Sequence, residues 1–385
     1  MKSEKPLFFN KNLLIIYSIT LIAVMGVASL APALPKIMDY YKISAQHVGL
    51  LIAVFTFPGI ILTPLTGILA DRIGRKKILI PSLFLFTIAG TSCAFISDFN
   101  SLLIMRFVQG IGAASIGSLN VTLIGDIFQG KQRGEAMGYN ASVLSIGTAS
   151  YPAVGGLLAT IGWNYPFLLS LLALPVGLLV IFSLENIEPK RNDNFRKYLK
   201  TAWIDIRKKE VLAIYTVSFL IFIVLYGSIL TYTPILLKQK FDSPSYMIGI
   251  LLSVMSIAMG ISATQVGKIS KILPPNKILV LAASLYMTSL LLMPLMPSTY
   301  LLIIPLLIFG FGNGLLMPTL QTVLAGKAPL EQRGIFMSFN GMVLRLGQTV
   351  GPIVVGLAFT FGLQWAFWIS VFVALIMMGM SRFIK

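Results

Sequence analysis

Charged residues and cysteine are scarce in this chain of 385 residues. Only 11% of the residues are charged, against about 25% in an ordinary soluble domain, and 56% are hydrophobic. The single cysteine, Cys93, excludes an intramolecular disulfide, and the single histidine, His47, excludes a multi-histidine metal site. We therefore expect no metal and no cofactor. A mean hydropathy of +0.87 cannot supply the polar surface of a soluble protein, so the composition indicates a membrane protein.

Long apolar runs account for most of the chain. A bilayer-spanning helix needs about 20 mainly apolar residues. Twelve such runs cover residues 12–34, 47–70, 77–97, 101–125, 135–160, 163–184, 211–237, 245–268, 276–296, 299–325, 332–361 and 364–382. Because the runs are continuously apolar rather than alternating, they predict helices and not barrel strands. We expect an all-α polytopic membrane protein with 12 transmembrane helices, without room for a soluble catalytic domain, and therefore not an enzyme.

The basic residues are distributed unevenly between the two sides of the predicted membrane. The formal net charge is +17. If the N-terminus is cytoplasmic, most of the 30 Lys and Arg fall in cytoplasmic loops, and only Lys36, Lys42, Lys238 and Lys240 lie outside. This asymmetry predicts a multi-pass protein of a prokaryotic cytoplasmic (inner) membrane with both termini cytoplasmic. It also accounts for the positive charge without a nucleic-acid partner.

The two halves of the chain repeat each other. Gly110 and Gly112 correspond to Gly310 and Gly312 at a constant offset, and further matches follow in both halves. One long polar stretch separates the halves. The predicted division is an N-terminal six-helix bundle, a cytoplasmic linker and a C-terminal six-helix bundle, at residues 1–184, 185–210 and 211–385. Parallel halves of this kind are typical of transporters whose substrate site lies between them near the middle of the bilayer.

The loop between the second and third runs reads GILADRIGRKK over residues 67–77. It resembles the signature loop of the major facilitator superfamily, G-x-L-A-D-R-x-G-R-[RK], at every specified position. The resemblance extends over the whole chain. It implies the major facilitator fold, with two pseudo-symmetric six-helix bundles, and secondary active transport.

The same resemblance implies a conformational latch on the cytoplasmic side. Asp71 would face the start of the eleventh span, and Arg75 would bridge to Asp126 at the end of the fourth. Gly67 would let the second span approach a neighbour closely, and Gly74 suits a tight turn. The predicted latch residues are Gly67, Asp71, Arg72, Gly74, Arg75 and Asp126. The alternative is that these charges serve membrane topology alone.

Spans five and eleven carry related glycine and proline motifs. They read GTASYPAVGG over residues 147–156 and GQTVGPIVVG over residues 347–356. The first resembles the motif G-x-x-x-G-P-x-x-G-G of the 12-helix drug–proton antiporter (multidrug efflux) branch, except that Tyr151 stands in place of its second glycine. The residues expected to permit close packing and a helix bend are Gly147, Pro152, Gly156, Gly347, Gly351, Pro352 and Gly356.

Two arginines lie within predicted spans. Arg106 belongs to an R-x-x-Q-G pattern that resembles the family's fourth helix, and it is either a coupling residue or a structural hydrogen-bonding centre. Arg345 lies near the middle of the bilayer, and none of the 13 Asp and Glu lies at that depth. Arg345 therefore predicts a cavity that favours anionic, zwitterionic or hydrogen-bond-accepting substrates. The alternative is an arginine satisfied by backbone carbonyls and water.

The function that these features favour is proton-coupled efflux of small amphipathic molecules or drugs by alternating access. Transport of an organic anion or metabolite, by uptake or exchange, is the alternative, followed by a non-transporting membrane sensor. The expected partners are the lipid bilayer, a small-molecule substrate and protons, and the protein is expected to be a monomer. The predicted cavity residues are Met25, Phe55, Asn120, Tyr226, Gln265, Asn313, Gln321, Arg345 and Gln348.

Overall fold

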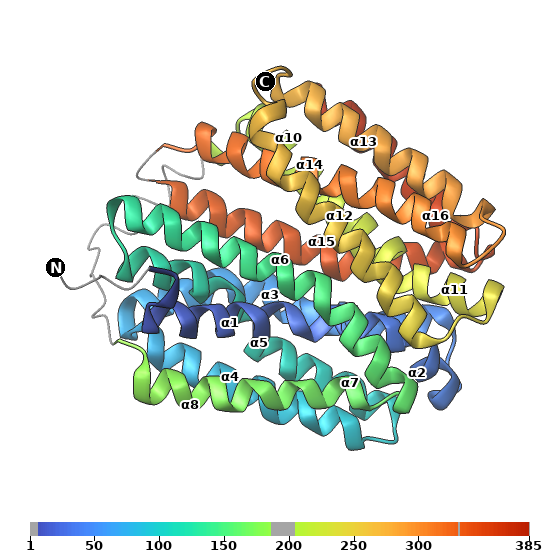
Figure 1. Cartoon of the computed structure of the whole chain (residues 1–385), viewed down its shortest axis with the longest axis horizontal. Helices are drawn as coiled ribbons and strands as arrows, with labels where there is room; N and C mark the ends of the chain where they lie inside the picture. The colour runs from blue at the N-terminus through green and yellow to red at the C-terminus, as the bar shows by residue number, and fades with distance from the viewer. Residues whose placement is uncertain (1–6, 186–204, 330–331, 385) are drawn as a thin grey trace.

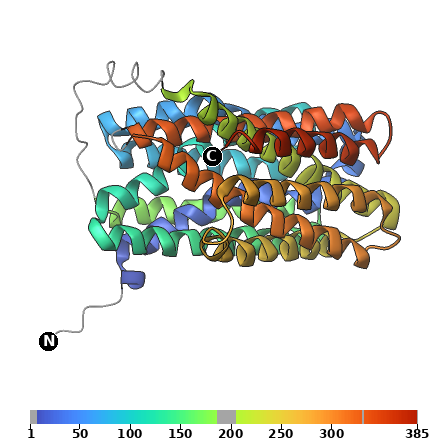
Figure 2. The same ribbon diagram turned by 90° about the horizontal axis from the view of Figure 1, so that it is seen from above.

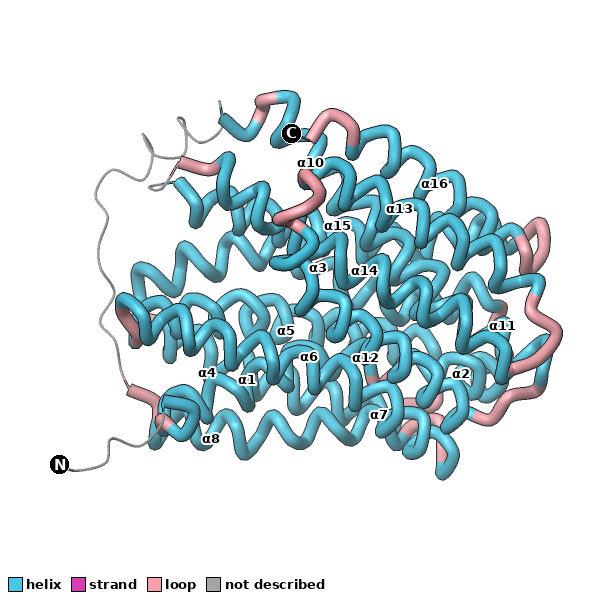
Figure 3. The backbone as a smooth tube through the Cα atoms, turned by 45° about the horizontal axis from the view of Figure 1, so that its top comes forward, coloured by secondary structure: helices cyan, strands magenta, loops and turns pink. Residues whose placement is uncertain are grey.

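The computed structural model describes residues 7–185, 205–329 and 332–384, and in these residues the chain forms helices joined by short loops (Figure 3). Eleven helical segments are long and apolar enough to cross a membrane, and the twelfth, Trp365–Ser381, is a shorter apolar helix. The predicted fold class, with 12 membrane-spanning helices, is confirmed. Residues 186–204 of the predicted linker lie outside the described residues, so the boundaries at 184 and 211 stay predictions.

Several spans are built from consecutive helical pieces of different type. In the N-terminal half these are η1 (Leu7–Phe9), α1 (Lys11–Ala28), η2 (Ala31–Ala33), α2 (Leu34–Tyr41), α3 (Ala45–Ile73), α4 (Arg75–Ser92), η3 (Cys93–Phe95), α5 (Phe99–Ile127), α6 (Gly130–Ile161), α7 (Tyr165–Leu168), η4 (Leu169–Leu172) and α8 (Ala173–Ser183). In the C-terminal half they are α10 (Lys209–Val224), η5 (Leu225–Tyr232), α11 (Thr233–Phe241), α12 (Ser245–Ile269), α13 (Pro275–Leu292), η6 (Met293–Leu295), η7 (Tyr300–Leu302), α14 (Ile303–Lys327), α15 (Arg333–Phe359) and α16 (Trp365–Ser381). Figure 1 shows the first set, coloured blue to green, beside the second set, coloured yellow to red.

Local sequence signals fix where several helices begin. The Asn10 side chain accepts the backbone N–H of Asn12 at the start of α1. Asp98 caps α5 by accepting the N–H of Ser101 at 2.8 Å, and this hydrogen bond lowers the pKa of the Asp98 carboxyl. Gly74 ends α3 with φ +102°, a conformation that residues with a Cβ rarely adopt, so glycine suits this turn as predicted.

The repeat seen in the sequence recurs in the packing. A Cβ added to Gly110 would lie 2.1 Å from the Phe55 carbonyl oxygen, and one added to Gly310 would lie 2.3 Å from that of Met255. Only glycine permits backbones to approach this closely. The loops after α2 and α11 also repeat each other, because each begins with a residue of positive φ, Lys42 and Asp242. The matching glycines therefore hold equivalent helix pairs together in both halves.

The ends of the molecule are defined by the helices that meet there. Asn12 at the start of α1 donates to Glu185, just beyond α8, at 3.0 Å, and Lys327 at the end of α14 pairs with Glu210 at the start of α10. We call this the linker end and the opposite one the distal end. The halves meet where α3 packs on α15 and α6 packs on α12. Figure 2 shows α3, in blue, in the same layer as the red α15.

Candidate functional site between the halves

The two halves are packed together at their distal ends. Along α3 and α15, the Tyr232 hydroxyl, from the adjacent η5, donates to the Ala45 carbonyl at 3.2 Å, and the hydroxyls of Thr56 and Thr349 lie 2.8 Å apart. Along α6 and α12, the Ala153 N–H donates to Ser253 Oγ at 3.0 Å. These three hydrogen bonds join the halves within the described part of the chain.

Contact between the halves ends toward the linker end. A Cβ at Gly156 would meet the Ser245 carbonyl at 2.5 Å, across the distal interface of α6 and α12. Nearer the linker end, Cβ atoms at Gly67, Gly138 and Gly260 would meet no atom within 4 Å. The halves are therefore closed against each other on the distal side and separated on the linker side.

Arg345 lies on α15, one helical turn nearer the linker end than Thr349. Its side chain reaches from α15 to the N-terminal half, because a Cβ at Gly59 would lie 3.0 Å from Arg345 Cδ and one at Gly117 would lie 3.2 Å from Nη2. Arg345 Nη1 donates to Gln348 Oε1 at 3.1 Å, and the guanidinium interacts electrostatically with Tyr226. The structure thus brings three of the predicted cavity residues together.

Tyr226 belongs to η5, a π-helical segment in the middle of its span. The Thr231 and Thr233 hydroxyls each donate to a carbonyl five residues earlier, at 2.6 and 3.0 Å, and so support the wider helical turn. The Tyr226 ring stacks on Phe222 with the centroids 5.6 Å apart. Short π-helical segments are frequent at functional sites.

Arg106 has a different environment from Arg345. It is 1% exposed, and its donors reach the carbonyls of Leu51 and Gly26 and the Gln109 side chain at 3.2, 3.1 and 2.6 Å. The guanidinium carbon also lies 4.1 Å from the Phe55 ring centroid. These contacts bind α1, α3 and α5 together, which favours the structural alternative for Arg106.

Four other predicted cavity residues pack inside one half and do not line the space between the halves. Met25 and Phe55 are buried in the N-terminal half, with Phe55 beneath Arg106. Asn120 donates to Thr20 at 3.0 Å, and Asn313 accepts the Tyr286 hydroxyl at 2.9 Å. Helical periodicity places such residues on a face but does not say which helix covers that face. In this conformation the four side chains are covered within one half, and their predicted part in the cavity stays a prediction.

Gln265 and Gln321 lie nearer the linker end and share no described contact with Arg345. Gln265 donates to Thr264 beside it, and Gln321 is exposed. Their predicted part in the cavity stays a prediction.

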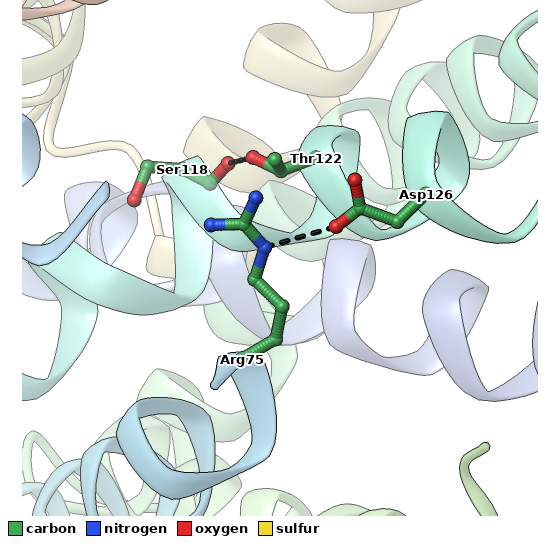
Figure 4. A network of polar contacts seen from close by, with 4 residues as sticks. All are labelled: Arg75, Ser118, Thr122 and Asp126. Carbon is green, nitrogen blue, oxygen red and sulfur yellow. Dashed lines mark hydrogen bonds and ion pairs between the residues drawn. The ribbon is translucent and has the colours of Figure 1, made fainter. Parts of the chain in front are cut away.

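The signature loop contains an observed ion pair. Arg75, from the start of α4, and Asp126, near the end of α5, point toward each other, with Nε and Oδ2 2.9 Å apart (Figure 4). The Asp71 side chain lies outside the described part of the structure, and Arg72 is exposed. A Cβ at Gly67 would meet no atom within 4 Å in this conformation, so the close approach at Gly67 stays a prediction.

The motif glycines contact helices of both halves. Cβ atoms at Gly347 and Gly351 would lie 2.6 Å from the Phe219 carbonyl and 2.7 Å from the Ile223 carbonyl, both on α10. A Cβ at Gly356 would lie 2.6 Å from the Tyr232 hydroxyl. In α6, Gly147 packs on α1, whereas the Pro152 carbonyl and Gly156 meet α12, and Pro352 of α15 contacts Gly49 of α3. Their predicted part in helix bending stays a prediction.

Four residues of the interface escaped the sequence reasoning. These are Gly59 and Gly117, which flank Arg345, and the pair Thr56 and Thr349. Each is a common residue type within an apolar run. Only the packing of α3 and α5 against α15 shows that it lies at the interface between the halves.

Two repeated six-helix bundles are closed against each other on one side and separated on the other, and a charged group lies between them. These features define a membrane transporter. A sequence model of the Major Facilitator Superfamily matches residues 16–352 and 247–384. The chain belongs to this superfamily. It is therefore a multi-pass membrane protein and a secondary transporter of a small molecule, and not an enzyme.

Relatives and solved structures agree with this assignment over nearly the full length. Multidrug resistance protein 2 of Bacillus subtilis (strain 168) is 26% identical over 379 residues, covering 96% of this chain and 94% of that protein. The bacillibactin exporter of Bacillus subtilis (strain 168) is 28% identical over 359 residues, covering 89% and 88%. A bacterial homologue of the human lysosomal transporter Spinster, in an inward-facing and unoccupied conformation, shares the fold with a TM-score of 0.80 and 17% identity, covering 99% and 98%.

Proposed function

We propose that this transporter exports small amphipathic molecules across a bacterial cytoplasmic membrane by alternating access. The observation that carries the proposal is the asymmetry of the interface: three hydrogen bonds join the halves distally, while Arg345 and Tyr226 are partly exposed where the halves separate. A molecule entering from the linker end would reach these side chains without passing the closed distal interface. Efflux relatives such as the multidrug resistance protein support the export direction.

The linker end is the proposed cytoplasmic end. Lys and Arg of the described residues gather there, in the loops that join α3 to α4, α5 to α6 and α12 to α13. In the described part of the chain, α2, α11 and the loops at the distal end carry four basic residues, Lys36, Lys42, Lys238 and Lys240. Cytoplasmic loops carry such an excess of basic residues, which supports cytoplasmic termini and an inward-open conformation.

Proton coupling is the proposed source of energy, and the glycine–proline motif of α15 supports it. Within the described helices, every Asp and Glu lies in the first or last two turns or beyond a helix end. A proton would therefore have to be carried by a carboxylate near a membrane surface, such as Asp126, or by the substrate. The proposed transporter acts as a monomer.

The test uses purified full-length protein in liposomes with an imposed pH gradient. Ethidium serves as an amphipathic cation and dansylglycine as an amphipathic anion, each loaded separately. We expect flux of at least one dye, accelerated by the gradient and absent from protein-free liposomes. Flux that does not depend on the pH gradient would contradict proton coupling. If the protein moved neither dye, the non-transporting sensor would be favoured.

A further inference from the structure

Arg345 is a cation shared between the two halves. It extends from α15 toward Gly59 of α3 and Gly117 of α5, and the two glycines leave the space that its side chain occupies. A side chain at either position would approach the arginine within about 3 Å. Two helices of the opposite half therefore accommodate this one residue.

The hydrogen-bonding capacity of Arg345 is largely unused. A guanidinium carries five N–H donors and no acceptor. Among the described residues, one of these donors binds Gln348 Oε1, and no carboxylate contacts the group. Arg106, by contrast, has three acceptors and is fully enclosed. Since both arginines lie inside the membrane bundle, the comparison marks Arg345 as the one available to a ligand.

We propose that Arg345, Tyr226 and Gln348 bind the anionic group of an amphipathic substrate, a carboxylate or a sulfonate; the inference rests on the proposed transport function. The planar fork of an arginine matches a carboxylate in a bidentate hydrogen bond, and Tyr226 carries a hydroxyl that can donate a further one. The substrate supplies the negative charge that the described part of the bundle lacks beside Arg345. An amphipathic cation would instead meet an uncompensated like charge.

The test compares two probes that differ by one charge. Dansylglycine carries a carboxylate, whereas dansylglycinamide is neutral and has the same fluorescent body. Binding of each to the purified full chain is followed by dansyl fluorescence. For Arg345→Gln we expect the affinity for the acid to fall by about 10- to 100-fold, as for the loss of a charge-assisted hydrogen bond. The affinity for the amide should change by less than about threefold.

Two further variants separate charge from packing. Arg345→Lys retains a cation and should restore at least part of the preference for the acid. Lys268→Gln removes one exposed cation near the linker end and should leave the preference of the wild type unchanged. If Arg345→Gln lowered the affinity for both probes equally, or changed neither affinity, the inference would be overturned.

Failure of the inference is distinguishable from failure of the proposed function. A wild-type protein that binds and transports ethidium and the amide, but not the acid, remains an exporter without an anion site. A protein that moves none of the three probes into or out of liposomes contradicts both proposals.

Discussion

The hydrogen bond between Thr56 and Thr349 offers a direct way to shift the balance between the closed and open distal interface. The Thr349→Val substitution removes the hydroxyl while keeping the branched shape of the side chain. Thr349 is 7% exposed, so its environment is close to that of a protein core. Because the bond crosses between α3 and α15, it exists only while the distal ends are in contact.

The size of the shift follows from one neutral hydrogen bond. Such a bond contributes a net of about 0.5–1.5 kcal/mol. The Thr56 hydroxyl keeps the Ile52 carbonyl as an acceptor, at 3.0 Å, so the variant leaves no donor unsatisfied. We therefore expect the ratio of distally open to distally closed protein to rise by about 2- to 12-fold in Thr349→Val.

Double electron–electron resonance between spin labels on the two halves measures this ratio. Ser101→Cys on α5 and Tyr300→Cys on η7 place labels at exposed distal positions. The native Cys93 is fully buried and should remain unlabelled. The expected result is a larger fraction of long distances in Thr349→Val than in the labelled parent.

Thr322→Val is the matched control, because the Thr322 hydroxyl donates to the Pro318 carbonyl within α14 and joins no other helix among those described. It should leave the distance distribution unchanged. If Thr349→Val and Thr322→Val both reproduce the parent distribution, the hydrogen bond does not hold the distal interface closed and the reasoning is refuted.

Four further predictions concern single sites. The partly exposed Arg75–Asp126 pair contributes about 1 kcal/mol, so Asp126→Asn should change the melting temperature little while slowing transport in liposomes. The Arg75→Asp, Asp126→Arg swap should restore the rate. Gly351→Leu should lower stability in detergent by about 1–3 kcal/mol or more, measured by thermal unfolding, because its Cβ would lie 2.7 Å from a backbone carbonyl of α10. Arg106→Gln should lower the melting temperature strongly, since each buried acceptor left without a donor costs about 1–3 kcal/mol, without changing the preference between dansylglycine and its amide. Because the pKa of Asp98 is lowered in the folded protein, its carboxylate stabilises the fold at pH values above the ordinary aspartate pKa. This stabilisation is lost as the pH falls through the lowered pKa. The melting-temperature difference between wild type and Asp98→Asn should therefore be present at neutral pH and disappear in acid.

Local patterns were enough to predict the class of fold. Hydrophobicity adds up along a run of about 20 residues, so the spans can be counted without knowing their neighbours. The signature loop and the repeated glycines likewise depend on short stretches of sequence. Gly110 and Gly310 were paired from the sequence, and both meet a carbonyl of an equivalent helix in the structure.

The candidate site was only partly predictable. Arg345, Gln348 and Tyr226 were expected to line a cavity, and the structure brings them together. Phe55 and Asn120 were expected there too, but they pack within one half. The periodicity of a helix gives the direction of each side chain relative to its neighbours on that helix. It does not give the rotation of that helix against the others.

The two intramembrane arginines show where the sequence by itself stops. It established that Arg106 and Arg345 lie within apolar spans and that no carboxylate lies at the depth of Arg345. Tertiary structure alone decided that Arg106 is enclosed by carbonyls of α1 and α3, whereas Arg345 lies between the halves with donors unused. The physical reason is that the acceptors of a buried cation come from helices distant in the chain, and their positions are set by how the helices pack.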